Sequence, residues 1–304
     1  EWRLAHNHSV YKPSNDPLNP PVLERPREIT PQDLGHFLRN PVNHFFQNRL
    51  SIQLTDPESS DDETEPFSIG GLTRYQLIGR LIDALINAEA DEQEQARARV
   101  CTQIKQAGEL PMGALGESSL APIEETATRV ATAWRSWVNA YPDHANVEEL
   151  TWRQPMGSEE LVASQWLRTR INAEGEQICL QHHAGAISGK PSQSFAIWPD
   201  HLLACAHDIP LTSVLVGADA VYCLSPLAAD KSAKLLDDLI GAWFQGLCYP
   251  LPLAEKTGLR FLESMIPHGD MYEALNKDKV RNQYEGAFRT TGELQYGKNA
   301  ALRR

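Results

Sequence analysis

The order of helical and strand-like segments predicts an α+β (or α/β) domain in which helices flank one mixed central sheet. Apolar residues recur at helical spacing through residues 29–141, and residues 147–183 are then rich in β-branched and apolar side chains. A short helix at 199–207, two further strands and the amphipathic segment 227–247 follow. A doubly wound nucleotide-binding fold does not fit this order, because strands and helices alternate throughout such folds.

Residues 29–50 predict two short, directly connected helices. Thr30 precedes Pro31 and stands three residues before Asp33, the pattern of an N-cap, a first-turn proline and an acidic third position. Asn40–Pro41 repeats the cap and the proline. Each helix has one apolar face that is expected to pack against a hydrophobic core. The residues of this face are Leu34, Phe37 and Leu38 in the first helix and Val42, Phe45, Phe46 and Leu50 in the second.

Three longer helices are expected next, over residues 70–86, Asp91–Ala107 and Glu117–Tyr141. Gly108 is the expected C-terminal cap of the second helix, and Pro142 ends the third. The residues expected to face the core are Leu77, Ile78, Leu81, Ile82, Leu85, Ile86, Val100, Ile104, Leu120, Ile123, Val130, Trp134, Trp137 and Val138.

Strand-like segments begin after Pro142, at Val147–Gln154, Glu160–Ile171 and Glu176–His183. Only the turn Asn172–Gly175 separates the last two, so we expect Leu161–Ile171 and Glu176–His183 to be adjacent and antiparallel.

The remaining segments complete the sheet and cover it. Thr212–Gly217 and Ala220–Leu224 predict a second hairpin, which brings the sheet to about five strands. Leu227–Leu247 predicts a strongly amphipathic helix, and Glu255–Met265 and Met271–Phe288 predict more polar helices.

Composition indicates a globular chain. With 304 residues and 41% hydrophobic content, the chain is long enough to bury a sizeable core. No run of eighteen apolar residues and no signal-peptide pattern is visible, so we expect a cytoplasmic protein without a membrane association. The cysteines form no C-x-x-C pair, which argues against zinc, iron–sulfur and disulfide frameworks and predicts buried thiols at 101, 179, 205, 223 and 248.

Charge is unevenly distributed. The net charge of −12 disfavours a free-standing, sequence-indifferent DNA-binding protein, so we expect weak DNA binding by the chain alone. Asp56–Glu65 carries six acidic residues without a basic one and is expected to be a solvated loop. Exposed arginines are candidates for DNA contact by charge alone, namely Arg25, Arg27, Arg39, Arg168 and Arg170.

The N-terminal segment, residues 1–28, predicts a connector from an upstream region. It shows neither helical nor strand periodicity and contains prolines at 13, 17, 20, 21 and 26, so it should run extended. His6 and His8 lack further metal ligands nearby.

Several catalytic motifs are absent from the sequence. No G-x-G-x-x-G follows a strand and no P-loop occurs, so ATP binding is not supported, and no G-x-S-x-G suggests a serine nucleophile. A metal site built on His182 and His183, with His201 or His207 as a further ligand, is an alternative. Adjacent histidines on a strand point to opposite faces, which disfavours that site.

Several segments resemble, in order, the C-terminal nuclease-like domain of the RecC family, and the element order resembles the restriction-endonuclease-like PD-(D/E)XK fold. The segments are FLRNPVNHFFQNRL, GLTRYQLIGRLIDAL, ELPMGALGE, IWPDHLLACA and LSPLAADKSAKLLDDLIGAWFQGLCYPLPL. The resemblance implies a nuclease-like domain over residues 29–304, preceded by the proline-rich connector 1–28 from an upstream helicase-like region.

The resemblance also implies that the active site is lost. In active nucleases of this fold, two acidic residues bind a divalent metal and a lysine polarises the attacking water. Aligning EGEQICLQHH with the second motif puts Gln181 at the carboxylate and His183 at the lysine, and aligning SQWLR with the first motif puts Arg168 at the other carboxylate. The upstream histidine of many relatives falls near Tyr75. These vestigial positions imply no catalytic residue, bound metal or cofactor. Trp166, Arg168, Gln181 and His183 are expected to lie near one another, with Arg168 filling the abandoned pocket beside Gln181.

The function implied is that of a non-catalytic scaffold and DNA-guiding domain in RecC, the gamma subunit of exodeoxyribonuclease V (RecBCD). RecB and RecD would be its partners in a heterotrimer that processes DNA ends in double-strand-break repair and recombination, and DNA would be bound within that complex. The alternative is a standalone metal-dependent nuclease of the PD-(D/E)XK type, which needs the acidic pair on adjacent strands.

Overall fold

The computed structural model describes residues 27–52, 69–145, 147–156, 159–251, 253–265, 277–287 and 290–291. The proline-rich segment up to residue 26 and the acidic segment Asp56–Glu65 lie outside the described residues, as does most of the first half of the helix expected at Met271–Phe288.

The first two helices are capped as predicted. Helix α1 is Pro31–Arg39 and α2 is Pro41–His44, and α2 continues as a π-helical turn, η2, at Phe45–Arg49. The Asp33 amide donates to Thr30 Oγ1 at 3.2 Å, and the Thr30 amide donates to Asp33 Oδ2 at 2.9 Å.

Most of the predicted apolar face of these helices is buried. Leu34, Phe37, Val42 and Phe45 are buried, and Leu38 and Phe46 are half-buried. Leu50 is 42% exposed, so its predicted burial is wrong. The π-helical turn explains the difference, because its wider turn rotates the following residue away from the face that an α-helix would present.

The strands form a five-stranded mixed sheet of order β2-β5-β6-β7-β8. Strands β6 and β7 run parallel, and the other neighbours are antiparallel. The bounds are Asp143–His144 (β2), Arg170–Ile171 (β5), Gln177–His182 (β6), Leu211–Val216 (β7) and Val221–Leu224 (β8). The predicted hairpin of β7 and β8 is confirmed.

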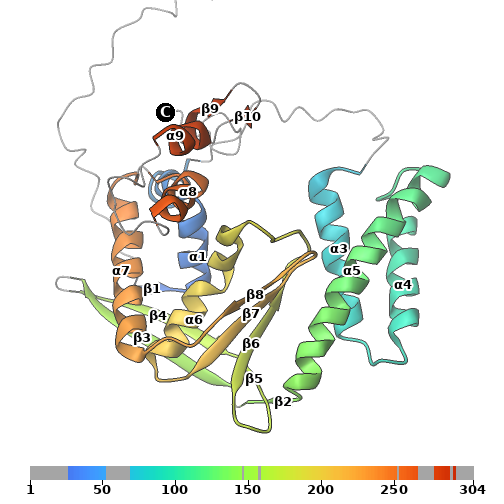
Figure 1. Ribbon diagram of the computed structural model, residues 1–304, viewed down its shortest axis with the longest axis horizontal. Helices are drawn as coiled ribbons and strands as arrows, with labels where there is room; N and C mark the ends of the chain where they lie inside the picture. Colours follow the sequence, from blue (N-terminus) through green and yellow to red (C-terminus); the bar gives the residue numbers. More distant parts are fainter. Residues whose placement is uncertain are drawn as a thin grey trace, which may run out of the picture.

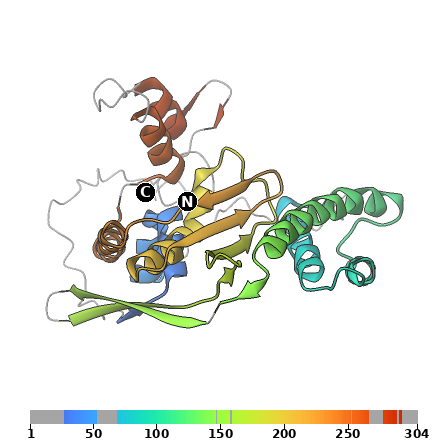
Figure 2. The same ribbon diagram turned by 60° about the horizontal axis from the view of Figure 1, so that its bottom comes forward.

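A second sheet, of order β1-β4-β3, holds Glu28–Ile29 (β1), Glu159–Leu167 (β4) and Glu148–Met156 (β3). The expectation of one sheet is therefore wrong. The predicted pairing with Glu176–His183 holds only for β5, where Ile171 lies opposite Gln177. Strand β4 pairs with β3 and β1 instead, because the extended segment breaks at residues 168–169 and changes sheets there. Figure 2 shows β3 and β4 as a long ribbon that extends beyond the five-stranded sheet.

Helices cover the five-stranded sheet on two sides (Figure 1). On one side lie α3 (Gly71–Ile86), α4 (Gln93–Gln106) and α5 (Ala114–Ala140), and on the other lie α1, α6 (Trp198–Ala206) and α7 (Ala229–Cys248). Helix α5 starts three residues before its predicted first residue, Glu117. The remaining elements are α8 (Glu255–Met265), α9 (Lys277–Glu285) and the short strands β9 (Gly286–Ala287) and β10 (Thr290–Thr291).

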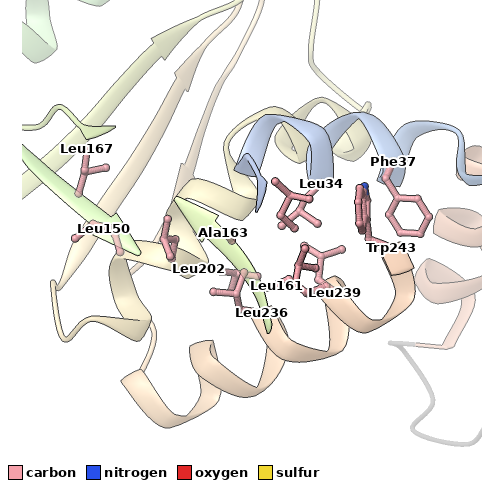
Figure 3. Close-up of a cluster of buried hydrophobic side chains, with 14 of the residues drawn as sticks. Leu34, Phe37, Leu150, Leu161, Ala163, Leu167, Leu202, Leu236, Leu239 and Trp243 are labelled. Atoms are coloured by element: carbon pink, nitrogen blue, oxygen red, sulfur yellow. The ribbon is translucent and has the colours of Figure 1, made fainter. Parts of the chain in front are cut away.

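Two large hydrophobic clusters hold these layers together. The first joins α1, α6 and α7 to the three-stranded sheet, and Figure 3 shows Leu34 and Phe37 of α1 facing Leu239 and Trp243 of α7. The second joins α3, α4 and α5 to β6 and β7. It contains the predicted α3 face and also Ile104, Leu120, Ile123 and Val130, whereas Val100, Trp134, Trp137 and Val138 are only half-buried.

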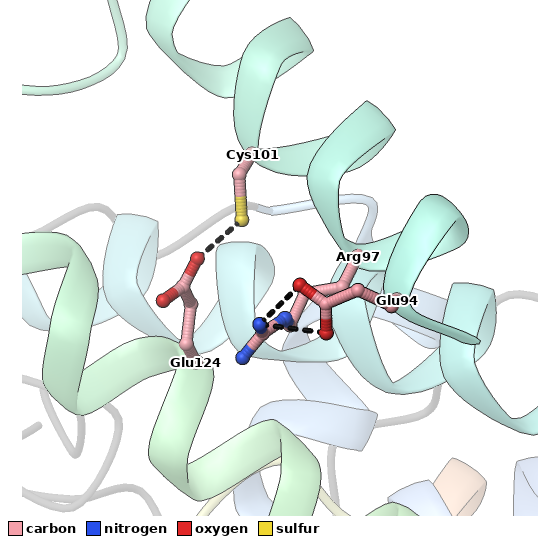
Figure 4. A network of polar contacts seen from close by, with 4 residues as sticks. All are labelled: Glu94, Arg97, Cys101 and Glu124. Carbon is pink, nitrogen blue, oxygen red and sulfur yellow. Dashed lines mark hydrogen bonds and ion pairs between the residues drawn. The ribbon is translucent and has the colours of Figure 1, made fainter.

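The five cysteines are all free, and their surroundings differ. Cys101 and Cys205 are buried as expected, but Cys223 is exposed. Cys101 Sγ donates to Glu124 Oε1 at 2.7 Å across the α4–α5 contact, beside the Glu94–Arg97 ion pair (Figure 4). Burial raises the pKa of the Cys101 thiol to about 12, so this cysteine is an unreactive part of the helix contact.

Among the described residues, none of the helices combines the length and the apolar character that a bilayer crossing requires.

Candidate functional site

Strand β6 presents alternating residues to the two sides of the sheet. Leu180 packs in the cluster of α3, α4 and α5, whereas Cys179 packs in the cluster that contains α6. Gln181, two residues after Cys179, lies on the same face of the strand, and its nearby side chain lowers the pKa of the Cys179 thiol. The β6 face that carries the predicted motif position Gln181 therefore lies toward α6.

Asp200, in the first turn of α6, supplies a carboxyl group next to this face. Gln165 of β4 approaches it, with Nε2 3.4 Å from Asp200 Oδ1. Desolvation raises the pKa of Asp200 to about 6, and the hydrogen bond from Gln165 opposes that shift. We call Gln165, Cys179, Gln181 and Asp200 the α6 seam.

The α6 seam is poorly suited to nucleophilic catalysis. Burial and, to a smaller extent, the nearby charge of Asp200 together raise the pKa of the Cys179 thiol to about 12. A thiol with such a pKa stays protonated at neutral pH and is a weak nucleophile. Within the described part of the chain, no group of three His, Cys, Asp or Glu residues could hold a metal ion.

His183 and Tyr75 meet at the end of β6. Their ring centroids are 5.3 Å apart in an edge-to-face arrangement, so two of the predicted motif positions are in contact. The Gly185 amide donates to His183 Nδ1 at 3.0 Å. Burial lowers the pKa of His183, and the positive charges of Arg39 and Lys190 lower it further, against the Gly185 carbonyl oxygen, 3.1 Å from Nδ1, which favours the protonated ring and raises it. His183 is thus a neutral, packed side chain at neutral pH.

Arg168 does not behave as expected. Its side chain is exposed in the break between β4 and β5, so it does not fill a buried pocket beside Gln181. Trp166, which was expected close to Gln181 and His183, is 60% exposed on β4 and pairs with Glu149. The change of sheet after β4 is the reason, because it removes Trp166 from the ladder that contains β6.

The histidines proposed for an alternative metal site have separate partners. His182 Nε2 lies 3.0 Å from Asp83 Oδ1 of α3, whereas the His183 ring contacts Tyr75, eight residues earlier on the same helix. The two nitrogens of His207 lie 2.8 Å and 3.2 Å from the carbonyl oxygens of Leu203 and Thr151. These contacts tie the rings to different parts of the fold and do not converge on one position.

His201 and Ser213 form a buried pair that resembles a base and a nucleophile. His201 Nδ1 lies 3.1 Å from Ser213 Oγ, and Nε2 lies 3.1 Å from the carbonyl oxygen of Ser225. Nε2 therefore donates to that carbonyl and Nδ1 accepts from the serine. The exposed fractions of His201 and Ser213 are 0% and 1%, so a substrate cannot reach them, and the pair instead ties α6 to β7.

Sequence reasoning missed Asp200 and Gln165. In the sequence alone, Asp200 resembles any acidic residue in the first turn of a helix, and such residues are usually exposed to solvent. The partial burial of Asp200 could have been predicted from its neighbours. Pro199 precedes it, and the apolar residues Leu202, Leu203 and Ala204 follow it, and their burial brings the start of α6 onto the sheet.

Among the arginines named as candidates for DNA contact, Arg170 makes hydrogen bonds within the fold. Its Nε donates to the Tyr141 carbonyl at 2.8 Å, and a terminal nitrogen donates to the Pro142 carbonyl at 2.9 Å. Arg27, Arg39 and Arg168 are exposed, and Arg25 lies outside the described residues.

Replacing Asp200 with asparagine is expected to stabilise the fold at pH 8 by about 2 kcal/mol. The folded-state pKa of about 6 lies above the usual 3.8, so the folded protein holds the Asp200 proton more tightly than the unfolded chain does. The stability from that proton is fully present below about pH 4 and is lost as pH rises through about 6. Asparagine removes the cost of burying the charge, so the gain should fall to about half at pH 5, where the unfolded chain is already ionised and the folded protein still holds the proton. Urea unfolding at both pH values measures it.

The matched control for this prediction is Asp238→Asn, at an exposed position of α7. Its effect should stay within about 0.5 kcal/mol at either pH. A gain from Asp200→Asn that is equal at pH 8 and pH 5 would show that the carboxylate is not desolvated as described.

Comparisons with known proteins point to one family. Residues 26–265 match the family model described as RecC C-terminal domain. The RecBCD enzyme subunit RecC of Escherichia coli (strain K12) is 26% identical over 320 aligned positions, which cover 96% of this chain and 25% of that protein. The RecBCD enzyme subunit RecC of Buchnera aphidicola is 20% identical and covers 88% of this chain and 23% of that protein.

This chain therefore spans about a quarter of the length of the curated relatives that it matches. Among solved structures, the crystal structure of SSO0001 aligns with 72% of this chain and 78% of its own, at 12% identity and a TM-score of 0.32.

Proposed function

The chain belongs to the RecC C-terminal domain family, and from this premise we propose that it is a non-catalytic scaffold and DNA-guiding domain of a RecC subunit. In this proposal it works with RecB and RecD in a cytoplasmic RecBCD helicase–nuclease that processes DNA ends in double-strand-break repair and recombination. Residues 29–304 form the domain, and residues 1–28 connect it to an upstream helicase-like region. The observation that carries the proposal is the family match over residues 26–265.

We further propose that the fold is a PD-(D/E)XK nuclease fold. The order of elements supports this: α5 leads into antiparallel strands that end in β6, α6 crosses over, and β7 returns parallel to β6. The sheet is mixed and has helices on both sides, as that fold requires.

The contacts of the side chains at the motif positions support the proposed absence of catalysis. The side chain of Gln181 lies near the Cys179 thiol, and His183 packs on Tyr75 and accepts from the Gly185 amide. An amide and a neutral imidazole do not supply the two carboxylates that hold magnesium in active relatives. Asp200 is a carboxyl group whose charge acts on Cys179, and desolvation disfavours its charged form.

The 304-residue chain is expected to leave DNA intact when it is incubated with linear duplex or single-stranded DNA and magnesium or manganese. The measurement is the size distribution of end-labelled DNA over several hours, and a Gln181→Ala variant purified in parallel controls for contaminating nucleases. Cleavage that depends on metal and disappears in the variant would favour the standalone nuclease instead.

A further inference from the structure

A cavity of about 740 Å³ lies outside the α6 seam, between α1, α2, η2 and the end of α7. Its size is within the range of ligand-binding pockets. The wall includes three rings, those of Phe37, His44 and Trp243, whose centroids lie 5.2 Å apart from Phe37 to His44 and from His44 to Trp243. Side-chain amides surround this aromatic wall, from Asn40, Asn43, Gln47 and Asn48.

Two nitrogen atoms in this wall are buried without a hydrogen-bond partner among the described residues: His44 Nε2 and Trp243 Nε1. The exposed fractions of the two residues are 7% and 5%. The Asn48 amide nitrogen lies 2.7 Å from His44 Nδ1, and an amide nitrogen can only donate, so Nδ1 accepts and the ring proton is on Nε2. Both orphaned atoms are therefore N–H donors, and unpaired buried donors are costly enough to be rare in native structures.

The backbone around the cavity is also unusual. The π-helical turn η2 places Gln47, Asn48 and Arg49 on the wall, and π-helical turns occur frequently at functional sites. Gly246 of α7 lets this helix approach closely, since a Cβ there would lie 2.7 Å from Phe37 Cε2. The aromatic wall thus depends on two local features, the π-helical turn and the glycine at position 246, that ordinary helix packing does not require.

The charges favour a neutral ligand. Burial lowers the pKa of His44 to about 4, against the charge of Asp33, so His44 offers a neutral N–H donor at pH 7. Glu28 and Asp33 place two carboxylates on the wall against the single guanidinium of Arg49, so the wall offers no surplus of positive charge to the phosphates of a nucleic acid strand. Peptide carbonyl groups are neutral acceptors that match two N–H donors. Strand β1, which contributes Glu28 and Ile29, is an edge strand beside which an extended chain can lie.

We infer that this cavity binds an extended, uncharged peptide segment of a partner polypeptide, whose main-chain carbonyl oxygens accept from His44 Nε2 and Trp243 Nε1. Because both nitrogens are buried, binding requires the exposed side chain of Gln47 to turn aside, while Asn48 keeps its contact with His44 Nδ1. This inference does not rest on the proposed function, because it concerns only the residues of this cavity.

The test is a titration of the 304-residue, ¹⁵N-labelled chain with the blocked peptide acetyl-Ala-Pro-Ala-Pro-Ala-amide. The chain has seven tryptophans, and Trp243→Phe identifies the indole N–H signal of Trp243. That signal is expected to shift progressively and to saturate, and Trp243→Phe should weaken peptide binding about tenfold, the effect of one lost hydrogen bond. Gln47→Trp, at an exposed position of the cavity wall, should block binding without disturbing the core.

Two parallel titrations decide between ligand classes. Oligothymidine of eight nucleotides and inorganic phosphate should leave the Trp243 signal unchanged. An unmoved signal with the peptide, binding that Gln47→Trp leaves intact, or an equal response to oligothymidine would each overturn the inference. None of these results would bear on whether the chain is a RecC domain.

Discussion

Replacing Gly35 with alanine is expected to lower the free energy of unfolding by about 3 kcal/mol, because α1 and the 3₁₀ turn at Pro191–Ala196 touch at this glycine. A Cβ at Gly35 would lie 2.6 Å from the carbonyl oxygen of Phe195. The obstacle is backbone, so no side-chain rotation relieves the clash. Helix α1 would have to move away, which would open the cluster around Leu34 and Phe37. Urea unfolding followed by tryptophan fluorescence measures the change.

Gly241→Ala is the matched control, since Gly241 is also inside a helix, α7, and nothing lies within 4 Å of a Cβ placed there. Alanine should stabilise that helix by up to about 1 kcal/mol through its higher helix propensity. Equal stability of Gly35→Ala and the wild-type chain would mean that α1 does not contact the 3₁₀ turn as described.

His201→Ala is expected to destabilise the fold by about 3 kcal/mol, because it removes two buried hydrogen bonds and leaves their partners unpaired. The Ser213 hydroxyl and the Ser225 carbonyl would lose their contacts with the ring, and Trp198 would lose the ring stacked on it at a centroid distance of 5.8 Å. The variant should keep its far-ultraviolet circular dichroism spectrum and unfold at a lower urea concentration.

The control for this histidine is His36→Ala on α1, where the side chain is exposed. Its effect should remain within about 0.5 kcal/mol. A His201→Ala effect as small as that of His36→Ala would contradict the role assigned to the His201–Ser213 pair.

Local features of the fold could be predicted from the sequence because they depend on neighbouring residues. Thr30 with Asp33, and Asn40 before Pro41, form the caps that their spacing indicates. Gly108 ends its helix with a φ of +68°, a conformation that favours glycine. The apolar face of α3 is buried as its periodicity predicts.

The partition of the strands could not be predicted in the same way. Alternation of apolar and polar residues indicates which side of a strand is buried but not which strand lies next to it. The segment Glu160–Ile171 therefore read as one strand, although β4 and β5 belong to different sheets. The displacement of Trp166 and Arg168 from β6 follows from this change of sheet.

The candidate site was predictable only where it follows strand alternation. Gln181 lies near the thiol two residues away on the same face, as period-2 spacing indicates, and His183 contacts Tyr75. Asp200 and Gln165 reach this region from α6 and β4, elements far apart in the sequence, so only tertiary packing brings them together. The unpaired nitrogens of His44 and Trp243 could not be predicted from the sequence for the same reason.

The central claim is that this domain supports the complex without taking part in cleavage. It is tested most directly by reconstituting the full-length subunit with RecB and RecD and introducing Gln181→Ala together with His183→Ala. Assembly is measured by gel filtration, and unwinding and cleavage of linear duplex DNA are measured with ATP and magnesium.

The account predicts that the double variant assembles, unwinds and cleaves DNA at rates close to those of the unaltered complex, whereas removal of residues 29–304 prevents assembly or unwinding. Loss of DNA cleavage by a double variant that still assembles and unwinds would contradict it, because that result would place Gln181 or His183 in the cleavage chemistry.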